Sequence, residues 1–124
     1  MKVLLVEDDK YLLGAYERFG FETKEDVELL IAENGQEAID FLEQESIDVI
    51  LLDLVMPELD GYGVLEYLQK TGKIENTTVY TFHDIDCLES RRRTREMGSC
   101  DFFVKPHASL EVLSQILLTG KVAY

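Results

Sequence analysis

The sequence predicts a doubly wound α/β fold, in which five parallel strands form one sheet with helices on both faces. Short apolar runs alternate along the chain with amphipathic segments of helical period, and most of these runs are continuously apolar rather than alternating in polarity. Continuous runs are typical of strands that are buried on both faces. Alternating strand and helix units with short connections give a parallel sheet with right-handed crossovers.

Each element is placed by its residues. The strands are expected at residues 3–6, 27–32, 49–52, 78–82 and 102–104. Amphipathic helices are expected over residues 12–19, 38–42, 64–68 and 110–117, and a further helix is expected over residues 87–97. Asn34 with Glu37, and Asp86 with Glu89, each have the spacing of a capping box at a helix start. Gly98 stands where the fourth helix is expected to end.

Length and composition restrict the class of protein. A chain of 124 residues suits a single domain, and its 30% of charged residues is ordinary for a globular protein. There is no apolar run long enough to cross a membrane and no signal peptide, so we expect a cytoplasmic protein. The net charge of −13 repels phosphate backbones, so direct binding of nucleic acid is not expected.

Polar side chains follow the predicted strands at the points where they end. Glu7 and Asp8 come after the first strand, Asp53 after the third, His83 after the fourth and Lys105 after the fifth. Ligands of open parallel α/β sheets bind at the carboxyl ends of the strands. The sequence therefore predicts one site at this edge.

The residue types at this edge suit phosphoryl chemistry. Asp8 and Asp53 could hold Mg²⁺, which prefers oxygen ligands, and a cation would relieve the repulsion between packed carboxylates. A carboxylate can attack phosphorus to give an acyl phosphate, so Asp53 is placed as nucleophile and Lys105 as partner of the phosphoryl oxygens. Taken singly, Asp53 could be a turn cap and Lys105 a loop residue. Their joint placement favours the site.

The sequence resembles the response-regulator receiver family of two-component signalling (CheY-like) over nearly its whole length. The matching motifs are VLLVEDD at residues 3–9, AENGQEA at 32–38, DVILLDLVMPELDG at 48–61, Gly98, and FFVKP at 102–106. The resemblance implies a flavodoxin-like sheet of order 2-1-3-4-5. It also implies a single receiver domain over residues 1–124, with no output domain visible in this chain.

The resemblance also implies roles for particular residues. Asp53 would accept the phosphoryl group from a histidine kinase or a histidine phosphotransfer protein. Asp8 and Asp53 would bind Mg²⁺ together with the main-chain carbonyl of Val55, and Glu7 would act through water. Lys105 would pair with the phosphoryl group. Such a domain is a phosphorylation-controlled switch rather than an enzyme, although it promotes its own phosphoryl transfer and slow dephosphorylation.

One position departs from the family pattern. The family usually has Thr or Ser at the end of the fourth strand, and an ungapped count back from Lys105 puts His83 there. A slip of two residues, compensated by an insertion, would bring in Thr81 instead. Phe102 matches the aromatic switch position of the family, although an aromatic residue in a strand also packs in the core.

Two further expectations concern lifetime and partners. Val55 and Ile85 match the variable positions beside the phosphoryl group, and neither can orient an attacking water, so self-dephosphorylation is expected to be slow. The fourth helix has a poor apolar stripe and carries Arg91 to Arg93 and Arg95. These arginines form either a solvated face or, with the fifth strand, a surface for a downstream partner or a self-dimer.

Two other readings compete with the signalling switch. A pseudo-receiver that binds partners without phosphorylation is weakly supported by His83. A metal-dependent phosphohydrolase would normally need a second acid two residues after its nucleophile, where this chain has Val55.

Overall fold

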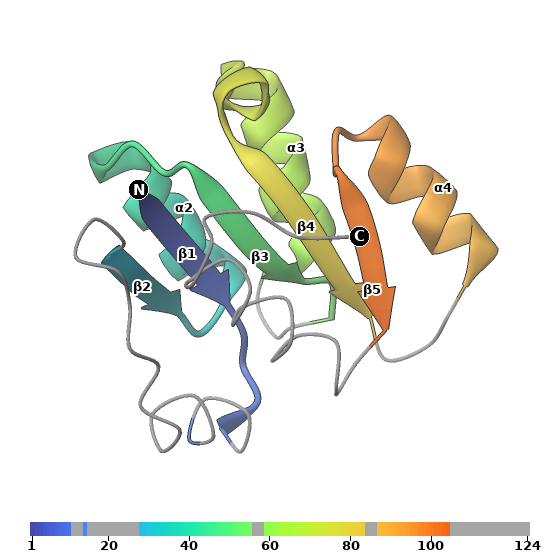
Figure 1. The fold of residues 1–124 in the computed structure, drawn as a ribbon, viewed down its shortest axis with the longest axis horizontal. Helices are drawn as coiled ribbons and strands as arrows, with labels where there is room; N and C mark the ends of the chain where they lie inside the picture. The colour runs from blue at the N-terminus through green and yellow to red at the C-terminus, as the bar shows by residue number, and fades with distance from the viewer. Residues whose placement is uncertain (11–13, 15–27, 56–58, 84–86, 105–124) are drawn as a thin grey trace.

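The computed structural model describes residues 1–10, 14, 28–55, 59–83 and 87–104. Five strands form one parallel sheet in the order β2-β1-β3-β4-β5 (Figure 1). Their bounds are Lys2–Val6 (β1), Glu28–Ala32 (β2), Val49–Asp53 (β3), Thr78–His83 (β4) and Asp101–Val104 (β5). The predicted fold class and strand order are confirmed. The helices predicted at 12–19 and 110–117 lie outside the described residues.

The strands are buried on both faces, as the continuous apolar runs predicted. Leu4 and Ile50 have no exposed surface and belong to the main hydrophobic core. Val3 and Leu51, which neighbour them along the strands and so point to the opposite face, are also fully buried. A side chain such as Leu contributes about 1.5–3 kcal/mol when fully buried, so burial of this kind on both faces stabilises the sheet strongly.

Among the described residues, three α-helices and one short 3₁₀-helix lie between the strands. They are α2 (Gly35–Gln44), α3 (Gly61–Thr71), η1 (Lys73–Asn76) and α4 (Leu88–Glu96). In Figure 1, α2 and α3 lie along the sheet and α4 lies beside β5 at its end. Side chains of α2 and α3 meet the strands in one core cluster, which includes Ala38, Val64 and Leu68. Within the described part of the chain, no helix has the length and apolar character needed to cross a membrane.

The helix ends confirm one predicted capping box and correct the other. The Asn34 carboxamide oxygen accepts a hydrogen bond from the Glu37 N–H at 2.8 Å, and its amide group donates to the Glu37 carboxylate at 3.1 Å. The box predicted from Asp86 and Glu89 is wrong, because Cys87 occupies the capping position of α4 and makes no side-chain cap. Asp86 itself lies outside the described residues. Gly98, with φ of +103°, follows α4 as expected.

Candidate functional site

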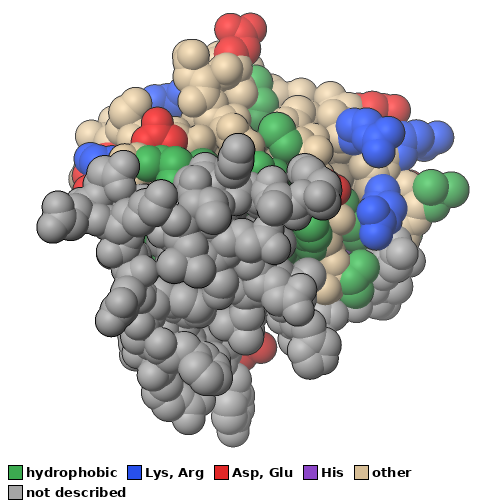
Figure 2. Space-filling model, viewed as in Figure 1, with side chains coloured by type: hydrophobic (Ala, Val, Ile, Leu, Met, Phe, Trp, Pro, Cys, Tyr) green, Lys and Arg blue, Asp and Glu red, His purple; other side chains and the backbone are tan. Residues whose placement is uncertain are grey.

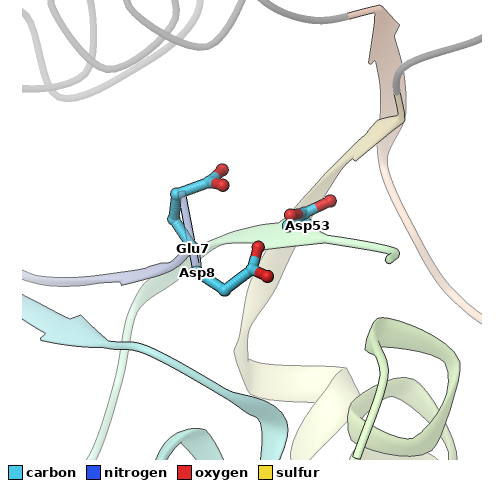
Figure 3. A group of neighbouring side chains, drawn as sticks. All are labelled: Glu7, Asp8 and Asp53. Atoms are coloured by element: carbon cyan, nitrogen blue, oxygen red, sulfur yellow. The ribbon is translucent and has the colours of Figure 1, made fainter. Parts of the chain in front are cut away.

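The carboxylates of Glu7, Asp8 and Asp53 meet at the carboxyl edge of the sheet. Val6 of β1 pairs with Leu52 of β3, so the residues that follow or end these strands lie side by side. Figure 3 shows Glu7 and Asp8 reaching from the end of β1 towards Asp53 at the end of β3. One carboxylate oxygen from each residue lies within 4.8 Å of the others. The predicted convergence of these three acids is confirmed.

Burial raises the energetic cost of bringing these three negative charges together. Glu7 is 2% exposed and Asp53 is 4% exposed, while Asp8 lies closer to solvent. The Asp9 N–H donates to the Glu7 carboxylate at 3.1 Å, and the Val55 N–H donates to Asp53 Oδ1 at 3.2 Å. Buried carboxylates of like charge are costly unless a cation or several hydrogen bonds offset their charge. An oxygen-lined site that is open on the Asp8 side suits a hard divalent cation.

The backbone around Asp53 depends on Gly61. The Leu54 N–H donates to Phe82 O at 3.0 Å, and the Gly61 N–H donates to Leu54 O at 3.1 Å. A Cβ atom at Gly61 would lie 2.5 Å from Asp53 O, so only glycine lets α3 begin against this backbone. Asp60 caps the same helix, since its carboxylate accepts from the Gly63 N–H at 3.0 Å. Neither role was predicted from the sequence, although the Asp60-Gly61 pair is a recognisable helix-start signal.

His83 and Thr81, the two candidates for the Thr or Ser position of the family at the end of the fourth strand, differ in their surroundings. Thr81 is fully buried, and its hydroxyl donates to Asp101 O at 3.1 Å and lies 3.1 Å from the Ser99 hydroxyl. His83 ends β4 directly after Phe82, which pairs with Asp53. His83 therefore lies at the carboxyl edge of the sheet beside Asp53, while the Thr81 hydroxyl forms hydrogen bonds in the interior.

An aromatic contact connects this edge to α4. The His83 and Phe102 rings are nearly parallel, at 22°, with centroids 6.2 Å apart. The Arg91 guanidinium group lies 4.8 Å from the centroid of the Phe102 ring. Phe102 is 5% exposed and belongs to the main core, so its predicted core packing is confirmed. Its role as the aromatic switch residue stays a prediction.

Two predicted residues of the site are not described. Lys105 and Ile85 lie outside the described residues, and their roles stay predictions. Val55, two residues after Asp53, is described and is 59% exposed.

Known proteins match the fold over most of the chain. The family model of the response regulator receiver domain matches residues 3–117. A probable transcriptional regulator, ycf27, from Guillardia theta is 31% identical in an alignment of 119 residues that covers 93% of this chain and 43% of that protein. The chain thus spans less than half the length of this curated relative.

Two solved receiver domains have the same architecture. The receiver domain of the Francisella response regulator 1452 is 30% identical, with a TM-score of 0.74 and 94% of each chain covered. The signal receiver domain of a DNA binding response regulator (merR) from Colwellia psychrerythraea is 25% identical, with a TM-score of 0.77 and coverage of 95% of this chain and 98% of that one. Since the family model covers nearly the whole sequence, including the acidic edge, this chain belongs to the response regulator receiver domain family of two-component signalling.

Proposed function

We propose that Asp53 accepts a phosphoryl group from a histidine kinase or a histidine phosphotransfer protein, in a reaction that depends on Mg²⁺. The chain would then act as a phosphorylation-controlled switch. The observation that carries this proposal is the buried Asp53 carboxylate at the edge of the sheet, with oxygens of Glu7 and Asp8 within 4.8 Å. Family membership supports a histidine kinase as partner.

The acids have separate proposed roles. Asp8 and Asp53 would bind Mg²⁺ with their carboxylates, and the main-chain carbonyl of Val55 would be a third ligand. Glu7 would act through water, which fits its hydrogen bond from the Asp9 N–H. A bound Mg²⁺ offsets negative charge on the phosphoryl oxygens during transfer.

The transfer itself is a displacement at phosphorus. A carboxylate oxygen of Asp53 forms a bond to phosphorus as the bond to the imidazole nitrogen of the donor breaks, and the electron pair of that bond stays on the nitrogen. The Val55 N–H, which holds Asp53 Oδ1 at 3.2 Å, helps to orient the attacking group. Lys105 would neutralise charge on the phosphoryl oxygens after transfer.

His83 would contact the phosphoryl group in place of the usual hydroxyl. An imidazole N–H can donate to a phosphoryl oxygen, although the ring is bulkier than a hydroxyl. The burial of Thr81 supports His83 for this role, since the Thr81 hydroxyl already bonds within the interior. A structure with a bound phosphoryl mimic should show the His83 ring turned towards it, and a ring turned to solvent would contradict the role.

We further propose that the phosphoryl group is lost slowly. The Val55 side chain stands exposed two residues after Asp53 and cannot position an attacking water. Replacement Val55→Asn should therefore accelerate dephosphorylation, as followed by intact mass over time. An unchanged rate would contradict this explanation.

A pseudo-receiver remains the second candidate function. One observation favours it: among the described residues no Thr or Ser hydroxyl stands at the end of β4, because Thr81 is interior. The phosphohydrolase reading has less support, because Val55 occupies the position where a second acid would be needed.

The proposal is tested by incubation with a small phosphodonor and intact-mass measurement. The wild type should gain one phosphoryl group with Mg²⁺ and none with a chelator present, and Asp53→Ala should gain none. Asp40→Asn, which removes an exposed carboxylate on α2, is the control and should label normally. No labelling of the wild type, even from a kinase, would favour the pseudo-receiver.

A further inference from the structure

The first turns of α2 and α3 meet around one residue, Leu59, which lies just before α3. Both helices begin at the carboxyl edge of the sheet, since each follows a parallel strand (Figure 1). The N–H of Gly35, the first residue of α2, donates to Leu59 O at 3.0 Å. Leu59 belongs to the segment that joins β3 to α3, four residues after Val55. Helix α2 is thus tied to a segment that leaves the acidic site.

The absence of a side chain at Gly35 makes this approach possible. A Cβ atom at the buried Gly35 would overlap Leu59 O and lie 2.8 Å from Leu59 C, both backbone atoms. A Cβ atom at Gly63 on α3 would also meet Leu59, but its three nearest atoms belong to the side chain, the first at 2.6 Å. A side chain can turn to another rotamer, whereas a displaced carbonyl moves the chain on either side of it. The two glycines therefore contact the same residue with different consequences.

The segment held by Gly35 contains a proposed metal ligand. The Gly61 N–H donates to Leu54 O at 3.1 Å and closes the segment at its base. Val55 follows Leu54 directly, and its main-chain carbonyl is the proposed third protein ligand of Mg²⁺. The bond from Gly35 to Leu59 O adds an attachment to a second helix. The segment is thus restrained from α2 as well as from α3.

We propose that Gly35 is a positioning residue for the divalent cation: by holding Leu59, it fixes the segment that places the Val55 carbonyl at the site. The inference rests on the proposed function, in which that carbonyl binds Mg²⁺. Gly35 has no side chain with which to bind the cation, so it acts through the backbone of Leu59. Mg²⁺ requires near-ideal octahedral geometry with oxygens at about 2.0–2.1 Å, so a small displacement of one ligand weakens binding.

The competing explanation is that this contact only packs α2 against α3. The two helices already share one core cluster, which includes Ala38 and Val64. A contact of this kind would contribute to the free energy of unfolding alone, and its loss would leave the metal affinity of the folded protein unchanged. The two explanations therefore differ in metal affinity rather than in stability.

The first test compares Mn²⁺ binding by the wild type, Gly35→Ala and Gly63→Ala. Mn²⁺ suits octahedral oxygen sites like those of Mg²⁺, and the EPR signal of the free ion measures its affinity directly. Gly35→Ala should bind Mn²⁺ about tenfold more weakly, as is typical when a residue that orients a metal ligand is changed. Gly63→Ala, which adds the same methyl group against the same residue, should bind Mn²⁺ like the wild type.

Neither glycine substitution changes the charge of the protein. A lower affinity in Gly35→Ala therefore cannot come from the net charge of −13, or from the Lys and Arg side chains that Figure 2 shows gathered on the side where α4 lies. A thermal melt of each variant shows whether it is folded at the temperature of the titration.

The second test uses the wild type, so it decides the question even if Gly35→Ala does not fold. Coupling between two sites is reciprocal, so saturating Mg²⁺ should slow hydrogen exchange of the Gly35 amide, also by about tenfold. The control is the Thr78 N–H, which donates to Asp48 O at 2.9 Å at the opposite edge of the sheet. NMR should show that the Thr78 amide slows by a smaller factor.

Three results would overturn the role of Gly35 alone. They are equal Mn²⁺ affinity of Gly35→Ala and the wild type, equal weakening in both glycine variants, and equal slowing of the Gly35 and Thr78 amides, which would mean that the metal stabilises the whole fold. A wild type that binds no Mn²⁺ would overturn this inference together with the proposed metal site. Phosphoryl labelling of Asp53 is measured separately by mass, so failure of the acceptor is distinguished from failure of the Gly35 role.

Discussion

Helices α3 and α4 contact each other but are held against the sheet in different ways. On α3, Val64, Leu65 and Leu68 are fully buried in the core, and Asp60 caps the first turn. The nine residues of α4 are all described, and the one that is buried among them is Thr94. At the start of α4, Cys87 holds the capping position and its side chain makes no cap hydrogen bond. Within the described part of the chain, apolar burial thus anchors α3, while the contacts of α4 are largely polar and ring contacts.

The segment that joins α4 to β5 is also held by polar contacts. The Ser99 N–H donates to Thr94 O at 2.9 Å, and the buried Ser99 hydroxyl donates to Asp101 O at 2.8 Å beside the Thr81 hydroxyl. Elements with few buried apolar contacts open at lower free energy than the core. The comparison indicates that α4 can shift more easily than α3.

The largest expected effect comes from deleting apolar surface on α3. Leu65→Ala should lower the free energy of unfolding by about 2–5 kcal/mol, since the side chain is fully buried. Leu88→Ala on α4 is the counterpart and should change it by no more than about 0.5 kcal/mol. Urea unfolding measures both, and equal losses would break the contrast between the helices.

A smaller loss is expected at the start of α3. Gly61→Ala should cost about 1–3 kcal/mol, because the new Cβ would lie 2.5 Å from Asp53 O and 2.8 Å from Leu54 Cα, both backbone atoms. It should also reduce phosphoryl labelling, since the Asp53 backbone must shift. In the control Gly63→Ala, the three atoms nearest to the new Cβ all belong to the Leu59 side chain, which can move. Normal labelling and stability in Gly61→Ala would refute this role.

The contact between Arg93 of α4 and the Tyr62 ring should contribute less to the free energy of unfolding. Arg93→Ala removes the guanidinium from the Tyr62 ring and should destabilise by about 0.5–1 kcal/mol. Amide hydrogen exchange in α4 should quicken, while that in α3 stays unchanged. Arg92→Ala is the control, because no ring contact is found for it in the described structure. Equal exchange in both variants would argue against a fastening role for Arg93.

The smallest effect concerns an exposed ion pair on α3. The side-chain hydrogen bond from Lys70 lowers the pKa of Glu66 below its ordinary value of 4.5. A lowered folded pKa gives stability above the unfolded pKa, which is lost as the pH falls through the folded pKa. In Lys70→Ala, NMR titration should show the Glu66 pKa rising towards 4.5, with little change in stability because the pair is exposed. An unchanged pKa would exclude this cause.

The sequence predicted what depends on local pattern and topology. Continuous apolar runs located all five strands to within one residue at each end, and the rule for strand ends brought Asp8 and Asp53 together. Tertiary contacts decided the rest. The interior role of Thr81 depends on Ser99 and Asp101, and the need for Gly61 depends on the backbone of Asp53. Such contacts join segments distant in sequence, so spacing alone could not predict them.

The most direct test of the central claim is to map the phosphoryl group after reaction with a small phosphodonor and Mg²⁺. Peptide mass spectrometry should find it on Asp53 alone, and Asp53→Asn, which keeps the shape of the side chain, should carry none. A phosphoryl group on Asp8 or another residue, or labelling that persists in Asp53→Asn, would contradict the assignment of Asp53 as the acceptor.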